Sequence, residues 1–585
     1  MKLQLFALVC AEPGVVMAAP LFVVGVGKHA EVVADTATHA GFTDVKFCSF
    51  AEEGEACATP PLTESVRSRY AGTVNEVLSA TSGASFIVAL GSNSARARFV
   101  DTHADLVYVN VVHPRAVVQS SLGGLGNVVM AGAIIQMGCT IGSHNIFNTG
   151  SSVDHHNEVH DFCHVAPNAT LCGSVKLFDG CFVGASAVVV PGTTLKPWSF
   201  VKANETVKAS TNMISIYEPE LSNYKTSALE AIESGRISFQ GKYPALAVEK
   251  LKERLGMPYV VLCCNGTVAT HCLFLALKHV HPTINKIYVP NNVYVAAWNC
   301  ALMEYEQSSL EVMRMDPETW NMCTDEAYIQ SLDRDAAVLI VHNVGNIINV
   351  PRLKRLRPDL IFVEDNCEGL FGKYDGVFVG AHEASLCSAV SFFANKSITS
   401  GEGGALFTTS ETLYAHMHAV CHQGVTKVRY LHSVHAYNYR MSNIQAALLY
   451  DQLCDLDTVL ARKRSVFETY DRLLAGLFAK GVLQPQRMEP GTSRANWMYA
   501  VRCVNHRNFA ALDQLFQAKG CDLRPMFFTI NTHAHLSAFK STEAAAELLA
   551  REVVMLPSSP GIKLDEQMHV VRVLTSYFQN EKCAA

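Results

Sequence analysis

The chain has 585 residues, which is too long for a single hydrophobic core and predicts three or four domains. Its net charge of −6 gives no reason to expect binding to nucleic acid or to a membrane surface. The 19 cysteines include no C-x-x-C pair, and many lie in apolar runs, as expected for buried, reduced thiols in a cytoplasmic protein.

Residues 1–20 form a leader or an extension ahead of the first predicted domain. Their start, M-K-L-Q-L-F-A-L-V-C-A, has a short apolar region that is weakly similar to a secretory leader. It is shorter than the roughly 20 apolar residues that a membrane span requires. We expect an extension on a cytoplasmic protein, with Met17 as an alternative start, because the first clear strand begins just after it.

Residues 21–110 are predicted to form a small Rossmann-like α/β unit. The segment P-L-F-V-V-G-V-G-K-H-A-E-V-V is typical of a strand, a glycine turn and a helix. Gly25 and Gly27 would let a ligand approach the backbone closely, although such turns also use glycine for steric reasons alone. Lys28 stands where a third glycine is common.

Residues 111–210 repeat an aliphatic residue at every sixth position. The positions are Val111, Val117, Val129, Ile135, Ile141, Val153, Val159, Val165, Leu171, Leu177, Val183, Val189, Leu195, Val201 and Val207, and Gly123 and Phe147 fill the two missing steps. Neither the helical nor the strand period explains this spacing, whereas a parallel β-helix of hexapeptide repeats does. Each repeat would supply one short strand with its aliphatic side chain inside the prism.

Residues 20 to 210 resemble the NeuD/PglD-like sugar acetyltransferases, whose left-handed β-helices form trimers and bind acetyl-CoA between prisms. The matching segments are F-V-V-G-V-G-K-H-A-E-V-V, V-H-P-R-A-V-V, F-N-T-G-S-S-V-D-H-H-N-E-V-H-D-F-C-H-V-A-P and L-C-G-S-V. The resemblance implies a general-base role for His155, contacts to acetyl-CoA by His164 and Gly173, and a place near the reacting groups for Asn148. It implies a nucleotide-sugar site at Gly25, Gly27 and His29.

One departure concerns the residue after the proposed base. The family usually has Asp or Glu there to orient the imidazole, and this chain has His156. Asp154, Glu158 or Asp161 are alternative orienting groups. The histidine cluster also admits a metal site, but no Cys or carboxylate spacing accompanies it, so we expect no metal.

Residues 211–235 contain no hexapeptide step and are predicted to be a linker with a short helix. Farther along the chain, the segment V-V-L-C-C-N-G-T-V-A-T-H-C-L-F-L-A-L, residues 260–277, predicts a strand followed by a helix. A phosphate would bind the first N–H groups of that helix at Gly266 and Thr267.

Two further motifs favour pyridoxal phosphate (PLP) as cofactor. The strand I-F-V-E-D ends at Asp365, and PLP needs a carboxylate at its pyridine nitrogen. The segment S-F-F-A-N-K-S-I-T-S-G-E-G-G places Lys396 between an apolar strand and a glycine cluster. A lysine in such a pocket is suited to covalent binding of an aldehyde.

Residues 236 to 585 resemble the DegT/StrS-type nucleotide-sugar aminotransferases of PLP fold type I, most closely the perosamine-synthase-like branch. The matching elements are G-R-I-S-F-Q-G, N-G-T-V-A, V-P-N-N-V-Y-V-A, V-E-D-N-C-E-G-L, the lysine segment, Y-N-Y-R-M-S-N-I-Q-A-A-L and L-R-P-M-F-F. The resemblance implies a large PLP domain over 236–455 and a small domain over 456–585.

The resemblance also implies a role for each matching residue. Lys396 would bind PLP covalently and move the proton, Asp365 would contact the pyridine nitrogen, and Glu368 the 3-hydroxyl. Gly266, Thr267 and Ser391 would hold the phosphate, Asn438 would come from a second subunit, and Tyr294 would stack on the ring. Retention of Lys396 favours amino transfer over the dehydration catalysed by relatives that have histidine there.

Together the two halves predict a bifunctional enzyme that aminates a nucleotide-linked 4-keto-6-deoxyhexose and then acetylates the new amine. We expect glutamate as the amino donor, UDP as the preferred nucleotide and acetyl-CoA as the acyl donor. Trimeric prisms joined to dimeric aminotransferases would close as a six-chain homo-oligomer. The alternative is an active aminotransferase whose β-helix serves only oligomerisation and sugar binding.

Overall fold

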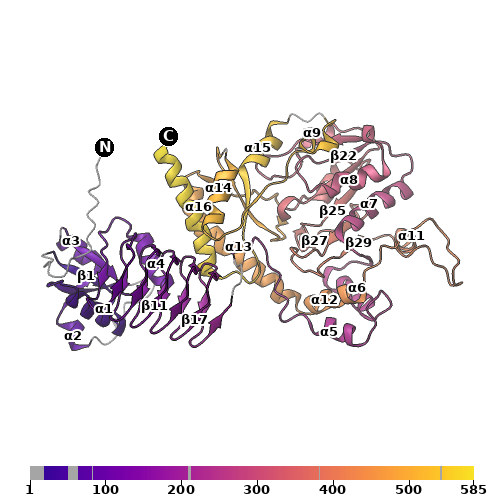
Figure 1. Cartoon of the computed structure of the whole chain (residues 1–585). Helices are drawn as coiled ribbons and strands as arrows, with labels where there is room; N and C mark the ends of the chain where they lie inside the picture. The colour runs from indigo at the N-terminus through magenta and orange to yellow at the C-terminus, as the bar shows by residue number, and fades with distance from the viewer. Residues whose placement is uncertain are drawn as a thin grey trace. The chain divides into compact units, whose positions relative to one another are not determined.

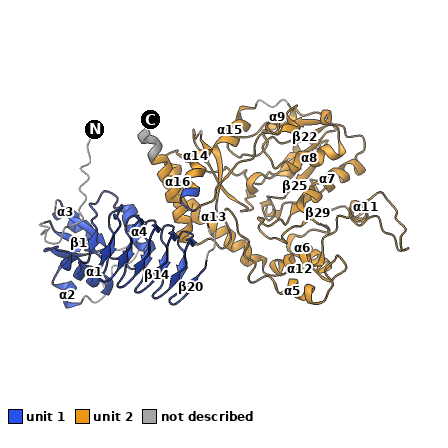
Figure 2. Ribbon diagram, viewed as in Figure 1, with its two compact units in different colours: residues 1–214, 517–520 blue, residues 215–516, 521–585 orange. Residues whose placement is uncertain are grey.

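This computed structural model describes residues 19–50, 63–81, 83–208, 213–380, 382–506, 508–539 and 543–584, so most of the expected N-terminal extension lies outside it (Figure 1). The chain forms two compact units (Figure 2). Unit 1 comprises residues 1–214 and 517–520, and unit 2 comprises residues 215–516 and 521–585.

The first part of unit 1 is a four-stranded parallel sheet with strand order β3-β2-β1-β4. Its elements are β1 (Leu21–Val24), α1 (Lys28–His39), β2 (Val45–Ser49), α2 (Glu64–Arg67), β3 (Tyr70–Thr73), α3 (Val74–Ala80), β4 (Ser85–Val88) and α4 (Asn93–Thr102). β1 is buried along its whole length, as expected for a central parallel strand covered on both faces. The predicted Rossmann-like architecture is confirmed.

The second part of unit 1 is a prism of three parallel sheets. One face contains β5 (Val111–Val112), β7 (Val128–Val129), β10 (Ile146–Phe147), β13 (His164–Val165), β16 (Phe182–Val183) and β19 (Phe200–Val201). The second contains β6 (Val117–Val118), β8 (Ile134–Ile135), β11 (Ser152–Val153), β14 (Thr170–Leu171), β17 (Val188–Val189) and β20 (Thr206–Val207). The third contains β9 (Thr140–Ile141), β12 (Glu158–Val159), β15 (Lys176–Leu177) and β18 (Thr194–Leu195).

The corners of the prism recur every six residues with positive φ. They lie at Gly126, Gly132, Gly138, His144, Gly150, His156, Phe162, Asn168, Ser174, Gly180, Ser186, Gly192, Trp198 and Asn204. Glycine and asparagine adopt this left-handed conformation at low cost, and the other residues are held in it by the repeated backbone pairing. The predicted left-handed parallel β-helix is confirmed.

The first coil departs from the predicted register. Val111 pairs with Val128 rather than Val129, and Val117 pairs with Ile134, so this coil is one residue shorter than the next. A shift of one residue turns a strand over. Val112 and Val118 therefore pack against the prism core, Val117 is 48% exposed, and Gly123 lies in a loop rather than a strand.

Arg96 of α4 joins the two parts of unit 1. Its guanidinium donates to Leu90 O, His144 O and Phe162 O at 2.9 to 3.0 Å, and to Asn93 Oδ1 at 3.0 Å. Burial lowers the pKa of Arg96 to about 10, so the side chain remains charged at neutral pH. The helix is thereby fixed to carbonyl groups at the same corner of two successive coils of the prism.

We predict that Arg96→Met destabilises unit 1 by about 3 kcal/mol, because several buried carbonyl groups lose their donor. For a unit of this size the loss lowers the melting temperature by roughly 6 to 12 °C. Calorimetry on the full chain measures it, with the transition of unit 2 as internal reference and the exposed Arg115→Met as control. An unchanged first transition contradicts the role of Arg96.

Unit 2 is built on a seven-stranded sheet with order β21-β29-β28-β25-β24-β22-β23, in which β29 runs antiparallel to both neighbours. The strands are β21 (Tyr259–Cys263), β22 (Ile287–Val289), β23 (Leu310–Val312), β24 (Ala337–Val341), β25 (Ile361–Asp365), β28 (Ser388–Ser391) and β29 (Gly404–Thr408). The accompanying helices are α5 (Thr226–Glu233), α6 (Tyr243–Leu255), α7 (Gly266–Val280), α8 (Ala296–Glu304), α9 (Glu326–Gln330), α10 (Val350–Leu356), α11 (Glu411–Cys421) and α12 (Asn443–Cys454). The 3₁₀ turns η1 (Gln307–Ser309) and η2 (Asn343–Gly345) complete this part.

The last third of unit 2 contains an antiparallel sheet with order β30-β32-β34-β33. Its elements are α13 (Leu456–Ala479), β30 (Leu483–Gln484), β32 (Tyr499–Cys503), α14 (Phe509–Ala518), β33 (Arg524–Pro525), η3 (Ile530–Thr532), η4 (Ala534–Leu536), α15 (Ala544–Glu552), β34 (Val553–Leu556) and α16 (Leu564–Ala584). A small sheet pairs β26 (Lys373–Tyr374) with β27 (Val377–Phe378) and β31 (Thr492–Ser493).

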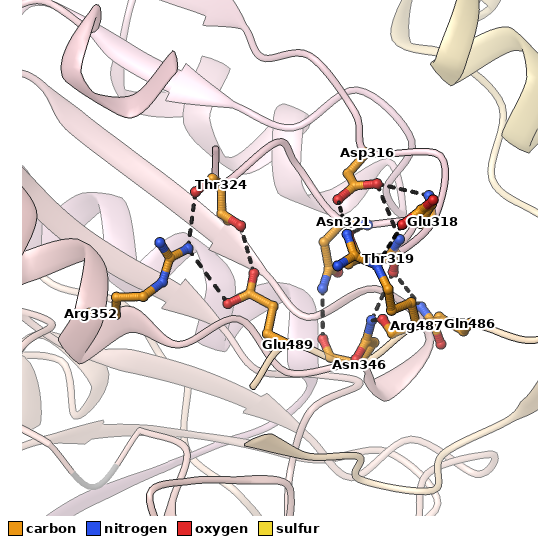
Figure 3. A network of polar contacts seen from close by, with 10 residues as sticks. All are labelled: Asp316, Glu318, Thr319, Asn321, Thr324, Asn346, Arg352, Gln486, Arg487 and Glu489. Carbon is orange, nitrogen blue, oxygen red and sulfur yellow. Dashed lines mark hydrogen bonds and ion pairs between the residues drawn. The ribbon is translucent and has the colours of Figure 1, made fainter. Parts of the chain in front are cut away.

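A polar network anchors residues 486–489 to loops of the large sheet (Figure 3). Asn346 Nδ2 donates to Arg487 O at 2.9 Å, and Gln486 Nε2 donates to Thr319 O at 2.9 Å. Thr324 Oγ1 donates to Glu489 Oε1 at 2.7 Å. The connection between β30 and β32 of the last sheet is therefore fixed at its start.

The segment expected to be a linker is part of unit 2 from Ser215 onward. Helix α5 packs against α12, and Ser227 Oγ donates to Asp451 Oδ1 at 2.5 Å. The short helix expected in this segment corresponds to α5, which the contact of Ser227 fixes to α12.

Within the residues that the structure describes, no helix combines the length and apolar character needed to cross a membrane.

Candidate active sites

The first turn of α7 and the end of β28 meet at the predicted phosphate-binding site. Asn265 caps the helix by accepting a hydrogen bond from Val268 N–H at 2.9 Å. A Cβ atom on Gly266 would lie 2.6 Å from Ser391 Oγ, so glycine is required for this close approach. A helix N-terminus with a nearby hydroxyl is a ready site for an anion.

Asp365 lies at the carboxyl end of β25, where α/β sheets bind ligands. Its side chain is buried and accepts hydrogen bonds from Thr270 Oγ1 at 3.4 Å and Cys367 N–H at 3.1 Å. These contacts fix the carboxylate in one orientation toward the cavity that it lines.

Glu368 is buried three residues farther along. Burial raises the pKa of Glu368 to about 7, and the positive charge of Lys396 opposes part of this rise. Glu368 Oε2 accepts a hydrogen bond from Val344 N–H at 2.8 Å. Val344 has φ of 56°, an unfavourable conformation for a β-branched residue, so this contact holds strained backbone beside the cavity.

Lys396 projects toward the ring of Trp497, with 4.1 Å between Nζ and the ring centroid. The Trp497 indole donates to Asn395 O at 3.0 Å, and Tyr217 OH donates to Lys396 O at 2.8 Å. Lys463 of α13 donates to Trp497 O at 2.7 Å, and burial lowers the pKa of Lys463 to about 7. The loop that carries Lys396 is thus held by Tyr217 on one side and by Trp497, itself fixed by Lys463, on the other.

Asp365, Glu368, Lys396 and Trp497 line one cavity of about 470 Å³. The predicted residues found in its lining are Gly266, Thr267, Tyr294, Asp365, Glu368, Ser391 and Lys396. Tyr294 is 61% exposed at the lining. Asn438 lies outside this cavity, exposed on a projecting arm, residues 422–442, that follows α11 (Figure 1).

The cavity also contains residues that the sequence did not single out. These are Glu402, Trp497, Met498, Arg524, Phe527 and Met555 among others. Arg524 and Phe527 belong to L-R-P-M-F-F, so that motif signalled their importance without assigning a role. Trp497 carries no motif, and only the folded chain brings it to Lys396.

The arrangement fits PLP. The helix N-terminus with Ser391 suits a phosphate, Asp365 suits a protonated ring nitrogen, and the Lys396 amine lies in the same cavity. Glycine at position 266 leaves room that a side chain would fill.

The model of the DegT/DnrJ/EryC1/StrS aminotransferase family matches residues 220–575, which is more than half of the chain. The chain belongs to this family. The aminotransferase region is therefore assigned to PLP fold type I, as the sequence predicts.

Individual relatives agree with this assignment. A GDP-perosamine synthase of Escherichia coli O157:H7 is 28% identical over 372 residues, covering 63% of this chain and 99% of the relative. The putative pyridoxal phosphate-dependent aminotransferase EpsN of Bacillus subtilis strain 168 is 27% identical over 363 residues, covering 60% and 91%. The structure of Helicobacter pylori PseC, an aminotransferase involved in pseudoaminic acid biosynthesis, is similar in fold, with a TM-score of 0.55, 22% identity and coverage of 63% and 100%.

Unit 1 brings together three of its predicted residues. The rings of His29 and His164 lie 6.0 Å apart, and Asn148 Nδ2 is 3.1 Å from His164 Nε2. Burial and the charge of Arg96 lower the pKa of His29, and they lower the pKa of His164 to about 3. Both imidazoles are therefore neutral at neutral pH. His29 Nε2 has no hydrogen-bond partner among the described residues, and the backbone of Gly91 lies beside the His164 ring.

The two glycines between β1 and α1, Gly25 and Gly27, differ in the space around them. Gly25 has φ of 130°, and a Cβ there would lie 3.2 Å from Ala89 O. Gly27 is the N-cap of α1, and a Cβ there would meet nothing within 4 Å. Steric need therefore accounts for Gly25, whereas the space beside Gly27 is open.

His155 forms a second group with Gly173. A Cβ on Gly173 would lie 2.5 Å from His155 Cε1, so the ring rests directly on this glycine. His155 Nδ1 is 3.1 Å from His156 Nδ1, whereas Asp154 Oδ1 accepts from the backbone N–H of His155. Glu158 pairs with Lys176, and Asp161 Oδ1 accepts from Ser143 N–H, so these carboxylates have other partners and the His155 ring meets the imidazole of His156 instead.

We predict that Glu368→Gln flattens the pH dependence of stability in the PLP-free enzyme. The pKa of Glu368 is raised from 4.5 to about 7, so the folded carboxyl holds a proton that the unfolded chain has lost. Stability therefore falls as pH rises between these values, by up to about 3 kcal/mol for this group.

Denaturant unfolding between about pH 5 and 8, followed by tryptophan fluorescence, measures the difference between wild type and variant. The exposed Glu383→Gln is the matched control and should keep the wild-type slope. Identical slopes for wild type and Glu368→Gln contradict the raised pKa.

Proposed function

We propose that unit 2 transfers an amino group from glutamate to the keto carbon of a nucleotide-linked 4-keto-6-deoxyhexose. The observation that carries this proposal is the convergence of Lys396, Asp365 and the α7 N-terminus in one cavity of an aminotransferase-family fold. Relatives named GDP-perosamine synthases favour an amino sugar as product. The sequence favours UDP, whereas those names favour GDP, so both nucleotides belong in the test.

PLP, when bound, supplies an electron sink that stabilises negative charge on the carbon beside the substrate nitrogen. Gly266, Thr267 and Ser391 would hold its phosphate, and the Asp365 carboxylate would keep a proton on its ring nitrogen. Lys396 Nζ would bind the aldehyde and later move a proton to or from the substrate carbon.

Other residues would position and shield the reacting groups. Glu368 would contact the 3-hydroxyl, and Tyr294 would cover the ring at the mouth of the cavity. Trp497 covers the Lys396 amine on one side, which limits the access of water to it.

We predict glutamate-dependent amination when the full chain is incubated with PLP and a panel of UDP- and GDP-linked 4-keto-6-deoxyhexoses. Mass spectrometry should show the keto oxygen replaced by an amino group, with 2-oxoglutarate formed in equal amount. Lys396→Ala should abolish both products because the amine that binds PLP and moves the proton is lost, and the exposed Lys480→Ala should retain them.

Amination that survives in Lys396→Ala contradicts the assignment. Loss of water from the sugar without glutamate would instead support the dehydration alternative.

We propose that unit 1 transfers an acetyl group from acetyl-CoA to the amine made by unit 2. His155 would remove the proton from the sugar amine, with Gly173 beside the coenzyme and His164 against it. His29 and Asn148 would face the nucleotide-sugar, and the unpaired Nε2 of His29 supports a polar ligand there.

A second candidate is a prism that only assembles the protein and binds sugar. The contact between the His155 and His156 rings favours it, because a carboxylate would stabilise the protonated base and a second imidazole does so less well. The two candidate functions differ in whether the prism catalyses acetyl transfer.

We predict release of CoA thiol when the full chain meets acetyl-CoA and the 4-amino sugar nucleotide. His155→Ala should reduce the rate by at least about 100-fold, the scale of general-base catalysis. The exposed His39→Ala should be unaffected, and His156→Asp should raise the rate by supplying an orienting carboxylate. Absence of thiol release with wild type supports the scaffold instead.

We further propose a homo-oligomer built from trimeric prisms and dimeric aminotransferase units, closing as six chains. The projecting arm supports a partner chain, because Val425, Val428 and Tyr430 are 56%, 61% and 81% exposed on it. Asn438 on the same arm would reach the neighbouring cavity.

A further inference from the structure

We propose that unit 2 contains a second site, a three-thiol site for monovalent copper formed by Cys263, Cys272 and Cys421. These residues come from three elements: the last residue of β21, the middle of α7 and the last residue of α11. Their sulfur atoms all lie within 4.8 Å of one another, and Cys272 Sγ is 3.6 Å from Cys421 Sγ. All three side chains are fully buried.

The spacing suits a single metal ion. With metal–sulfur bonds of about 2.3 Å, three sulfurs arranged in a triangle around one ion lie about 4 Å apart. The observed separations are compatible with this value after small side-chain rotations. No local sequence motif produces the cluster, because the three residues are brought together only by packing of the two helices on the sheet.

The three sulfur donors favour Cu⁺ over other metal ions. Among the described residues, no histidine or carboxylate joins the three thiols as a further ligand. His271, the neighbour of Cys272, is already engaged, with Nε2 3.0 Å from Glu304 Oε1 and Nδ1 3.1 Å from Tyr439 OH. Structural zinc sites are almost always four-coordinate, whereas soft sulfur donors favour Cu⁺, which accepts three.

The surroundings are apolar. The three cysteines belong to the buried core that also contains Leu413, Met417 and Val420. Such a shell excludes water and oxidants, which favours the monovalent over the divalent state of copper.

A bound ion would connect α7 with the base of the projecting arm, two parts of the proposed aminotransferase site. Cys272 lies on α7, whose first turn forms the predicted phosphate-binding site. Cys421 directly precedes the projecting arm. Tyr439, at the other end of the arm, donates its N–H to Cys421 O at 3.0 Å and accepts from Cys264 N–H at 2.8 Å. The ion would therefore stabilise α7 and the base of the arm relative to β21.

The test uses the full chain, reduced and handled without oxygen. Cu⁺ is added as its acetonitrile complex against bicinchoninate, a coloured chelator that reports the copper not bound by protein. We expect wild type to withhold one equivalent per chain and Cys421→Ala and Cys272→Ala to lose that equivalent. Cys387→Ala, a buried cysteine of the same core outside the cluster, is the matched control and should retain it.

Stability provides a second readout that does not depend on activity. Cu⁺ should raise the melting temperature of unit 2 in wild type and Cys387→Ala but not in Cys421→Ala. Circular dichroism verifies that each variant folds, and Cys263→Ser, the most conservative change, replaces any alanine variant that does not.

Four outcomes overturn the proposal. Retention of no copper by wild type means that the thiols serve only as small core residues, and equal retention by Cys421→Ala places the copper elsewhere. A disulfide between Cys272 and Cys421 in freshly purified protein, seen as a linked peptide two hydrogens lighter, means a redox pair. Tighter binding of Zn²⁺ than Cu⁺ in the same assay contradicts the three-coordinate site.

Discussion

The aminotransferase site depends on keeping one amine and two carboxyl groups in a single cavity without an ion pair between them. Lys396, Asp365 and Glu368 line the same space, and the two described carboxyl groups have partners other than Lys396. Asp365 is instead held by Thr270 and a backbone N–H, and Glu368 by Val344. Because other groups hold each carboxyl, the Lys396 amine remains available to a ligand. The pKa of Glu368 is raised because its carboxyl is buried and the charge of Lys396 offsets this burial only in part.

That arrangement requires the last third of the chain as well as the sheet. The polar network around Glu489 and Asn346 fixes the segment that leads to Trp497. Lys463 then fixes the Trp497 backbone, and the indole contacts both Asn395 and Lys396. The loop that carries Lys396 is therefore positioned by residues 102 positions away, at Trp497, and 179 positions away, at Tyr217.

Sequence patterns predicted much of this because several signals were local. The six-residue period defines the prism, and the strand endings at Asp365 and Ser391 place their side chains at one edge of the sheet. The slip at Val111 was not predictable, since the register there is set by pairing with Val128 rather than by spacing. Trp497 and Lys463 were missed because their contacts arise only from tertiary packing, and His156 gave no sign of meeting the ring of His155.

Fusion of the two units has a chemical rationale in the proposed function. The amine produced by one activity is the nucleophile of the other, and a covalent link raises the local concentration of the shared intermediate. The neutral imidazoles of unit 1 and the cavity of unit 2 would then handle successive forms of one nucleotide-sugar.

The most direct test of the central claim is reduction of the PLP-loaded protein with borohydride, followed by digestion and peptide mass spectrometry. We expect the pyridoxyl group on the peptide that contains Lys396, and a yellow protein that loses its colour on reduction. A pyridoxyl group on Lys463, the buried lysine whose pKa is about 7, or a protein that remains colourless with PLP, would contradict the account.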